Sequence, residues 1–315
     1  MAVAGSFRKA SRQKVKASIM IEGIQGTGKS GLALVIAHAL ASAPDKIAAI
    51  DTENQSLDLF DGLQSHLGKE FAGFMKVDLT KDDGYAPSNY DLLRKKAIEA
   101  GAEVVIMDSI SHMWNRSGGM LDLVTQASKS ATREYNAWGT DRNIKEKELI
   151  FDLVRSNQAH IITTVRSKEK FDMQKDEATG RSTVVSLGEQ QIQQDGLKYE
   201  PDLVLRMVSA GTPSGTPPVA LVLKSRYAIL EKDVTYEFDK NLLDSLKKYL
   251  EEGVDPEELL ALQKQDVLDA IKEFCDTPAK KSLWTQIKKN MGVQGKAEDM
   301  PLVLLRQGYR TLTED

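Results

Sequence analysis

The chain has 315 residues, of which 41% are hydrophobic and 28% charged, which is ordinary for a folded protein with one large domain and one small one. Its net charge of −4 excludes a generally cationic surface, so any contact with nucleic acid has to come from local basic patches. A single cysteine excludes an internal disulfide, and no apolar run approaches membrane-spanning length, so we expect a cytoplasmic protein that does not enter a membrane.

The first part of the chain leads to a nucleotide-binding motif. Residues 1–16 are polar and basic, and we interpret them as an arm that is either solvated or in contact with a partner. The apolar run 17–22 predicts a buried strand, and the next residues read G-x-x-x-x-G-K-S, the phosphate loop of P-loop NTPases. A helix is predicted over 29–42, so backbone N–H groups at its N-terminus would surround a polyphosphate.

This motif assigns roles to individual residues. Lys29 is expected to reach the β- and γ-phosphates of ATP, and Ser30 to hold Mg²⁺. The residues that we expect to bind the nucleotide are Gly23, Gln25, Gly26, Thr27, Gly28, Lys29, Ser30 and Gly31.

Two further apolar runs end in carboxylates. The predicted strand 46–50 leads to Asp51 and Glu53, and the predicted strand 103–107 leads to Asp108. An acid after a strand, beside a phosphate loop, is suited to hold Mg²⁺, so Asp108 is our second metal ligand. ATP hydrolysis also needs a carboxylate that deprotonates water, and Glu53 is our candidate for that base.

The rest of the chain alternates strand and helix patterns up to a boundary near Gly253. This alternation predicts an α/β fold with a mainly parallel sheet covered by helices on both faces. We therefore assign 17–252 to the ATPase core and 253–315 to a small α-helical domain of three or four helices. The other predicted strands are 73–77, 159–165, 203–208, 219–224 and 233–237, and the other predicted helices are 90–100, 141–157 and 241–252.

Several segments leave two interpretations open. The polar stretch 167–195 predicts a loop of mixed charge, either solvated or in contact with nucleic acid through Phe171. Trp114 and Trp138 suit either stacking on bases or packing. His112 is expected to be structural. A lysine-rich segment around Trp284 fits either a phosphate backbone or a solvated surface.

Five segments, in order along 17–240, resemble RecA-type recombinases. Residues 50–58 (IDTENQSLD) resemble the family's I-D-A-E-x-x-L-D, with one extra residue, and 108–111 (DSIS) resemble D-S-[VI]-[AS]. Residues 162–166 take the place of the strand that ends in a polar sensor. Residues 197–205 are similar to the strand after the second DNA-binding loop, and 223–227 (LKSRY) resemble the K-N-R-F motif of RadA-like members.

The resemblance implies a RecA-like P-loop core in which Glu53 activates water. Thr164 stands where the family has its sensor glutamine, so the resemblance implies that Thr164 contacts the γ-phosphate as a catalytic residue, although its side chain is shorter than glutamine. Lys224 and Arg226 would reach the γ-phosphate of a neighbouring subunit, which implies a homo-oligomer, a ring or a filament. The absence of a preceding helical domain resembles phage-encoded RecA/RadA-like ATPases, which would act in the cytoplasm of the host cell.

The expected function is Mg²⁺-dependent ATP hydrolysis coupled to single-stranded DNA in recombination, annealing or repair. One alternative is a nucleotide-gated adaptor that loads a partner protein without touching DNA, which the acidic net charge favours. Another is a hexameric helicase motor. Salt-dependent binding to single strands separates the first from the second, and ATP-driven unwinding identifies the third.

Overall fold

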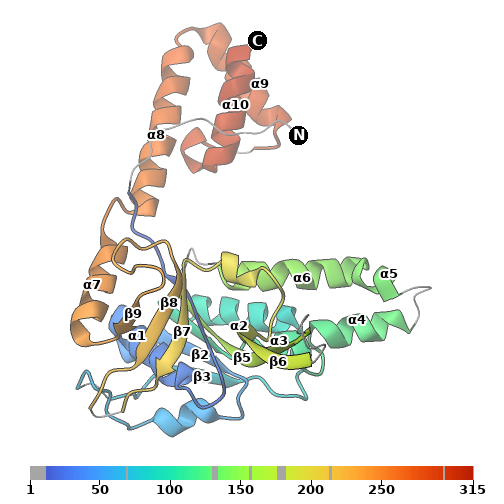
Figure 1. Ribbon diagram of the computed structural model, residues 1–315. Coiled ribbons are helices and arrows are strands. Elements are labelled where there is room, and N and C mark those ends of the chain that lie inside the picture. The colour runs from blue at the N-terminus through green and yellow to red at the C-terminus, as the bar shows by residue number, and fades with distance from the viewer. Residues whose placement is uncertain are drawn as a thin grey trace. The chain divides into compact units, whose positions relative to one another are not determined.

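The structure is a computed structural model and describes residues 12–68, 70–129, 134–155, 158–175, 182–212, 215–293 and 295–314 (Figure 1). The chain divides into two compact units. One is Val15–Leu250, and the other combines Met1–Lys14 with Glu251–Asp315. In the part of the chain that is described, no helix has both the length and the apolar character needed to cross a membrane.

The larger unit is built on a mixed sheet whose strands occur in the order β3-β2-β4-β5-β1-β7-β8-β9. The strands β1 to β5 and β7 run parallel, whereas β8 and β9 are antiparallel additions at one edge. The strand bounds are β1 (Ser18–Gly23), β2 (Ile47–Asp51), β3 (Met75–Asp78), β4 (Val104–Asp108), β5 (His160–Lys175), β6 (Ser182–Gln191), β7 (Leu203–Ser209), β8 (Val219–Ser225) and β9 (Thr235–Glu237).

Helices cover both faces of this sheet, because alternate residues of each central strand point to opposite sides. One face carries Ile19 and Ile21 of β1 and packs against α1 and α7. The other carries Met20 of β1 and packs against α2, α3, α4 and α6. The helices of this unit are α1 (Lys29–Leu40), α2 (Pro87–Glu99), α3 (His112–Asn115), α4 (Met120–Ser128), α5 (Glu134–Trp138), α6 (Asp141–Leu153) and α7 (Lys240–Glu251).

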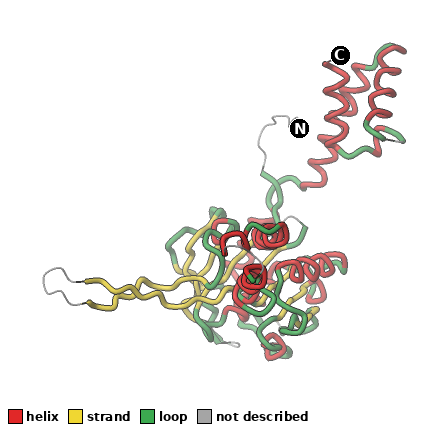
Figure 2. The backbone as a smooth tube through the Cα atoms, turned by 90° about the vertical axis from the view of Figure 1, so that its right-hand side faces the viewer, coloured by secondary structure: helices red, strands yellow, loops and turns green. Residues whose placement is uncertain are grey.

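The predicted loop over 167–195 is wrong. The strand β5 continues to Lys175 and pairs with β6 as an antiparallel hairpin, which extends beyond the body of the unit in Figure 2. The hairpin forms through main-chain hydrogen bonds between two segments that are rich in charged and polar residues. Because strands usually lack such residues, the sequence pattern indicated a loop instead.

The smaller unit contains α8 (Pro256–Phe274), α9 (Pro278–Asn290) and α10 (Leu302–Glu314). Its core is apolar and includes Leu268, Trp284, Ile287 and Leu305. Trp284 is buried in this core, and it also lines a cavity of about 440 Å³ together with Lys272 and Lys281. At the start of the chain, Arg12 forms an ion pair with Glu252 at 3.0 Å. The backbone of Arg12 and Lys14 is hydrogen-bonded to that of Val254, whereas residues 1–11 of the basic arm lie outside the described residues.

Candidate functional site

The phosphate loop connects the end of β1 to the first turn of α1. Gly26 and Gly28 have φ angles of 82° and 90°, in the left-handed region that favours glycine. A Cβ atom at Gly28 would lie 2.5 Å from the Cβ of Ala210, so space requires glycine there as well. Lys29 Nζ donates to the Ile24 carbonyl at 2.9 Å. Burial lowers the pKa of Lys29, so an anion bound beside it would stabilise its charged form.

The end of β4 places a carboxylate where a metal ion fits. Asp108 is buried and accepts a hydrogen bond from the Thr164 hydroxyl on Oδ1, whereas its Oδ2 has no hydrogen-bond partner. Burial raises the pKa of Asp108, and hydrogen bonds from Ser30 and Thr164 oppose that effect. A buried carboxylate oxygen without a partner, together with the Ser30 hydroxyl, is the kind of hard oxygen donor set that Mg²⁺ prefers. These residues therefore fit the metal that accompanies a nucleotide.

Asp51 has its oxygens occupied by the backbone. It accepts hydrogen bonds from the N–H groups of Glu53, at 2.7 Å, and Leu57, at 3.0 Å. Asn54 and Gln55, between these two donors, have φ angles of 59° and 63°, so the chain turns sharply after β2. The bonds to Asp51 stabilise this turn and hold Glu53 at the edge of the sheet. Asp51 is therefore bound to the backbone of the turn that carries the candidate base.

The carboxylate of Glu53 is paired with Arg166, which lies on β5. Arg166 Nε donates to Oε1 at 2.7 Å, and Arg166 Nη2 donates to Oε2. Burial alone would raise the pKa of Glu53, but the hydrogen bonds and charge of Arg166 lower it. Glu53 is thus ionised, as a general base must be, but both of its oxygens are engaged.

The phosphate loop, the two strand-end acids and a mainly parallel α/β sheet are thereby brought together in one unit. Residues 15–235 match the protein family described as AAA domain, which covers most of the chain. The chain belongs to the AAA domain family. No curated protein matches it. An AAA domain with this phosphate loop indicates a P-loop ATPase that binds and hydrolyses nucleotide.

His112 lies in the AAA domain site, although the sequence indicated only a structural role. Its Nδ1 is 2.9 Å from Thr52 Oγ1, a hydroxyl that also donates to the Ser109 carbonyl. This network assigns the proton to Nδ1 and leaves a lone pair on Nε2. The buried Nε2 atom has no hydrogen-bond partner and lies 3.9 Å from Glu53 Oε1. Burial lowers the pKa of His112 to about 4, so the ring is neutral.

Two acceptors at that separation suit a shared O–H donor, such as an attacking water. A histidine four residues after the acid of a strand end was the signal available in the sequence. It was too weak to distinguish this site from an ordinary buried histidine.

Thr164 is fully buried in the AAA domain, and its hydroxyl donates to Asp108. The structure therefore places it behind the metal ligand, where it can hold the Asp108 carboxylate in position. Arg166, two residues further along β5, is the residue of this strand that is paired with Glu53.

Lys224 and Arg226 lie away from the phosphate loop of their own AAA domain. Lys224 is opposite Val204, near the start of β7, whereas the phosphate loop lies at the carboxyl ends of the parallel strands. Lys224 Nζ donates to the carbonyls of Tyr199 and Pro201. Arg226 is exposed and forms an ion pair with Asp202 at 2.9 Å. Within one chain, neither basic residue belongs to the nucleotide site.

A groove of about 390 Å³ lies at the base of the β5–β6 hairpin of the AAA domain. Among its lining residues are Trp114, Asn115, Lys168 and Gln190. The indole rings of Trp114 and Trp138 pack with their centroids 6.1 Å apart, so packing accounts for part of the role of both tryptophans. Phe171, the other proposed stacking residue, has a side chain outside the described residues.

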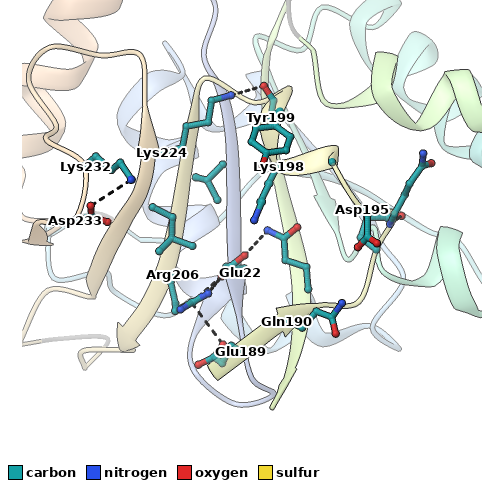
Figure 3. Close-up of a pocket in the computed structure, with 16 residues that line it drawn as sticks. Glu22, Glu189, Gln190, Asp195, Lys198, Tyr199, Arg206, Lys224, Lys232 and Asp233 are labelled. Carbon is teal, nitrogen blue, oxygen red and sulfur yellow. Dashed lines mark hydrogen bonds and ion pairs between the residues drawn. The ribbon is translucent and has the colours of Figure 1, made fainter. Parts of the chain in front are cut away.

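A second cavity, of about 650 Å³, lies over β1, β7 and β8 (Figure 3). At its floor Arg206 donates to the buried Glu22 at 2.6 Å, and the Gln191 amide also donates to Glu22. On another wall Lys232 pairs with Asp233 at 3.4 Å. Although Glu22 directly precedes Gly23, residues 24–30 do not line this cavity. The cavity is therefore distinct from the phosphate loop, because none of its lining residues belongs to 24–30.

Proposed function

We propose that this AAA-type ATPase has a RecA-like core and couples Mg²⁺-dependent ATP hydrolysis to single-stranded DNA in recombination, annealing or repair. The observation that carries the proposal is the convergence of Lys29, Ser30, Glu53 and Asp108 at the carboxyl edge of one parallel sheet. Asp108 is assigned to the metal, and its neighbour Ser109 has no carboxylate, so the base has to come from another strand. We assign this role to Glu53, which follows the neighbouring strand β2.

Each residue has a definite part in this chemistry. The backbone of 26–30 and Lys29 would hold the phosphates, and Ser30 and Asp108 would hold Mg²⁺, which when bound offsets charge on the phosphates. Glu53 would accept a proton from the attacking water, and the lone pair of His112 would help to orient that water.

The first experiment measures ATP hydrolysis. Lys29→Ala should abolish it while leaving the fold intact, because the lysine acts as a point charge on the phosphates. Glu53→Gln should keep nucleotide binding and slow hydrolysis by roughly a hundredfold or more, the scale of a lost general base. Near-normal turnover in a folded Lys29→Ala protein would contradict the assignment of the phosphate loop. Loss of activity in Asp51→Asn but not in Glu53→Gln would contradict the choice of base.

Binding to single strands is supported by the groove beside the hairpin, which combines an indole, amides and Lys168. Aromatic stacking and phosphate contacts are the two features shared by proteins that bind single strands. A labelled single-stranded oligonucleotide should bind in the presence of ATP, and its affinity should fall as the salt concentration rises. Trp114→Ala and Lys168→Ala should reduce that binding, whereas Lys147→Ala, at an exposed lysine of α6 that does not line the groove, should not.

Two other functions are distinguished by the same assay. A protein that hydrolyses ATP but binds no oligonucleotide at low salt would be the nucleotide-gated adaptor, which the net charge of −4 favours. ATP-driven separation of a duplex would identify a helicase motor.

The proposed oligomer rests on Lys224 and Arg226, which lie away from the nucleotide site of their own chain. An arginine from a neighbouring subunit would stabilise charge on the transferring phosphoryl group. When Lys29→Ala and Arg226→Ala proteins are mixed, some interfaces join an intact phosphate loop to an intact Arg226, and activity should partly return. Mixed assemblies that form but stay inactive at every ratio would exclude a trans role.

A further inference from the structure

The ion pair between Glu53 and Arg166 places the candidate base in an inactive arrangement. A general base must present a basic oxygen to the water, but both oxygens of Glu53 accept hydrogen bonds from one guanidinium, whose positive charge makes the carboxylate a weaker base. A bidentate arginine–carboxylate pair is among the stronger side-chain interactions. The two side chains are only 24% and 20% exposed, so solvent screens this pair less than a surface ion pair.

Arg166 also lies beside the phosphate loop. In the register of β1 and β5, Arg166 is opposite Gly23, the first residue of the G-x-x-x-x-G-K-S motif. Burial is the main cause of the lowered pKa of Lys29, and the positive charge of Arg166 lowers that pKa further. Among the described residues, the charges of Lys29, Asp108 and Arg166 therefore act on one another at one edge of the sheet.

The backbone of Arg166 is held on both sides. Its N–H donates to Ser111 Oγ at 2.9 Å, and its carbonyl accepts from Ile192 N–H at 2.7 Å. The side chain of Arg166 can therefore exchange partners without movement of the strand. A phosphate group suits the planar guanidinium as well as a carboxylate does, and it carries more charge.

We propose that Arg166 is a positioning residue that sequesters Glu53 in the nucleotide-free protein and exchanges Glu53 for the terminal phosphate of a bound triphosphate. Glu53 then becomes free to accept a proton only when the phosphate to be attacked is present. The inference rests on the proposed ATPase function. It also assigns to Arg166 the contact with phosphate that the sequence had suggested for Thr164.

The test compares binding of two ligands with Mg²⁺ by calorimetry: a non-hydrolysable ATP analogue and ADP. Arg166→Ala should weaken binding of the analogue by roughly 10- to 100-fold, which is the scale of a lost hydrogen bond to a charged group. The affinity for ADP should stay nearly unchanged. Arg206→Ala is the matched control, because Arg206, on β7, also pairs with a buried glutamate, Glu22. This variant should bind both ligands with unchanged affinity. If Arg166→Ala does not fold, Arg166→Gln and Arg166→Lys serve for the same comparison.

A double-mutant cycle tests the sequestration itself. Glu53→Gln should tighten binding of the analogue several-fold, because Arg166 no longer has to leave a carboxylate. Much of that gain should disappear when Arg166 is also replaced by Ala. An equal gain in both backgrounds would show that Glu53 acts only by repelling the phosphate and would overturn the exchange.

The outcomes also separate this inference from the proposed function. The role of Arg166 alone would be overturned if the wild-type protein binds both nucleotides and hydrolyses ATP, but a folded Arg166→Ala protein keeps the wild-type ratio of affinities for the analogue and ADP. A wild-type protein that binds neither nucleotide would overturn the ATPase function and the inference together.

Discussion

The two central glycines of the phosphate loop should respond differently to the same substitution. Gly26 and Gly28 both have left-handed φ angles, so alanine at either position should cost about 1–2 kcal/mol of folding free energy. At Gly26 the added Cβ meets nothing within 4 Å. At Gly28 it would lie 2.5 Å from Ala210 Cβ and 2.8 Å from Ala210 Cα, and such overpacking typically costs a further 1–3 kcal/mol. Gly28→Ala should therefore be the less stable variant by about 1–3 kcal/mol.

Urea unfolding of the nucleotide-free proteins measures this difference without any contribution from ligand binding. Tryptophan fluorescence is suitable because Trp114 and Trp138 lie in the larger unit. In thermal unfolding, each kcal/mol should correspond to about 2–4 °C for a domain of this size. Removing the Ala210 methyl group with Ala210→Gly should relieve part of the overlap, so the double variant should recover at least about 0.5 kcal/mol relative to additivity.

Equal losses of unfolding free energy in Gly26→Ala and Gly28→Ala would refute the reasoning. They would show that only the left-handed φ angle, and not the overlap with Ala210, opposes alanine. The absence of any coupling between Gly28→Ala and Ala210→Gly would show that the segment after β7 moves away from the added methyl group without a loss of stability. Either result would mean that the close approach of Ala210 does not constrain the loop.

Two further predictions concern buried polar side chains. Burial lowers the pKa of His160 from 6.5 to about 4, so below pH 6.5 the unfolded chain binds a proton that the folded chain refuses, and stability should fall by about 3 kcal/mol as the pH drops to 4. Urea unfolding across this range should show a steeper loss in wild type than in His160→Gln, and equal slopes would contradict the prediction. Tyr90→Phe removes a buried hydroxyl that donates to the Ser109 carbonyl at 3.1 Å. Because Thr52 also donates to that carbonyl, the loss should be only about 0.5–1.5 kcal/mol by the same measurement, and a loss above 3 kcal/mol would show that Thr52 does not compensate.

The sequence by itself determined the features that depend on neighbours along the chain. The G-x-x-x-x-G-K-S spacing between an apolar run and a helix pattern located the phosphate loop, because backbone geometry and helix capping are local properties. Apolar runs that end in Asp51 and Asp108 located two strand ends, and parallel strands bring such ends to one edge. The alternation of strands and helices likewise indicated an α/β sheet, although the local pattern failed at the hairpin, whose polar strands are held by main-chain pairing.

Only the tertiary structure decided which side chains meet at that edge. Arg166 and Glu53 are 113 residues apart, and their pairing depends on the order β2-β4-β5-β1 and on the register that sets Arg166 opposite Gly23. His112 is neutral because its packing removes it from water, and no pattern around it signals that burial. Lys224 is separated from the phosphate loop because β8 runs antiparallel to β7 and ends at the opposite edge of the sheet. Strand order, strand direction and desolvation arise from contacts between segments that are distant along the chain, so the spacing of residues does not encode them in readable form.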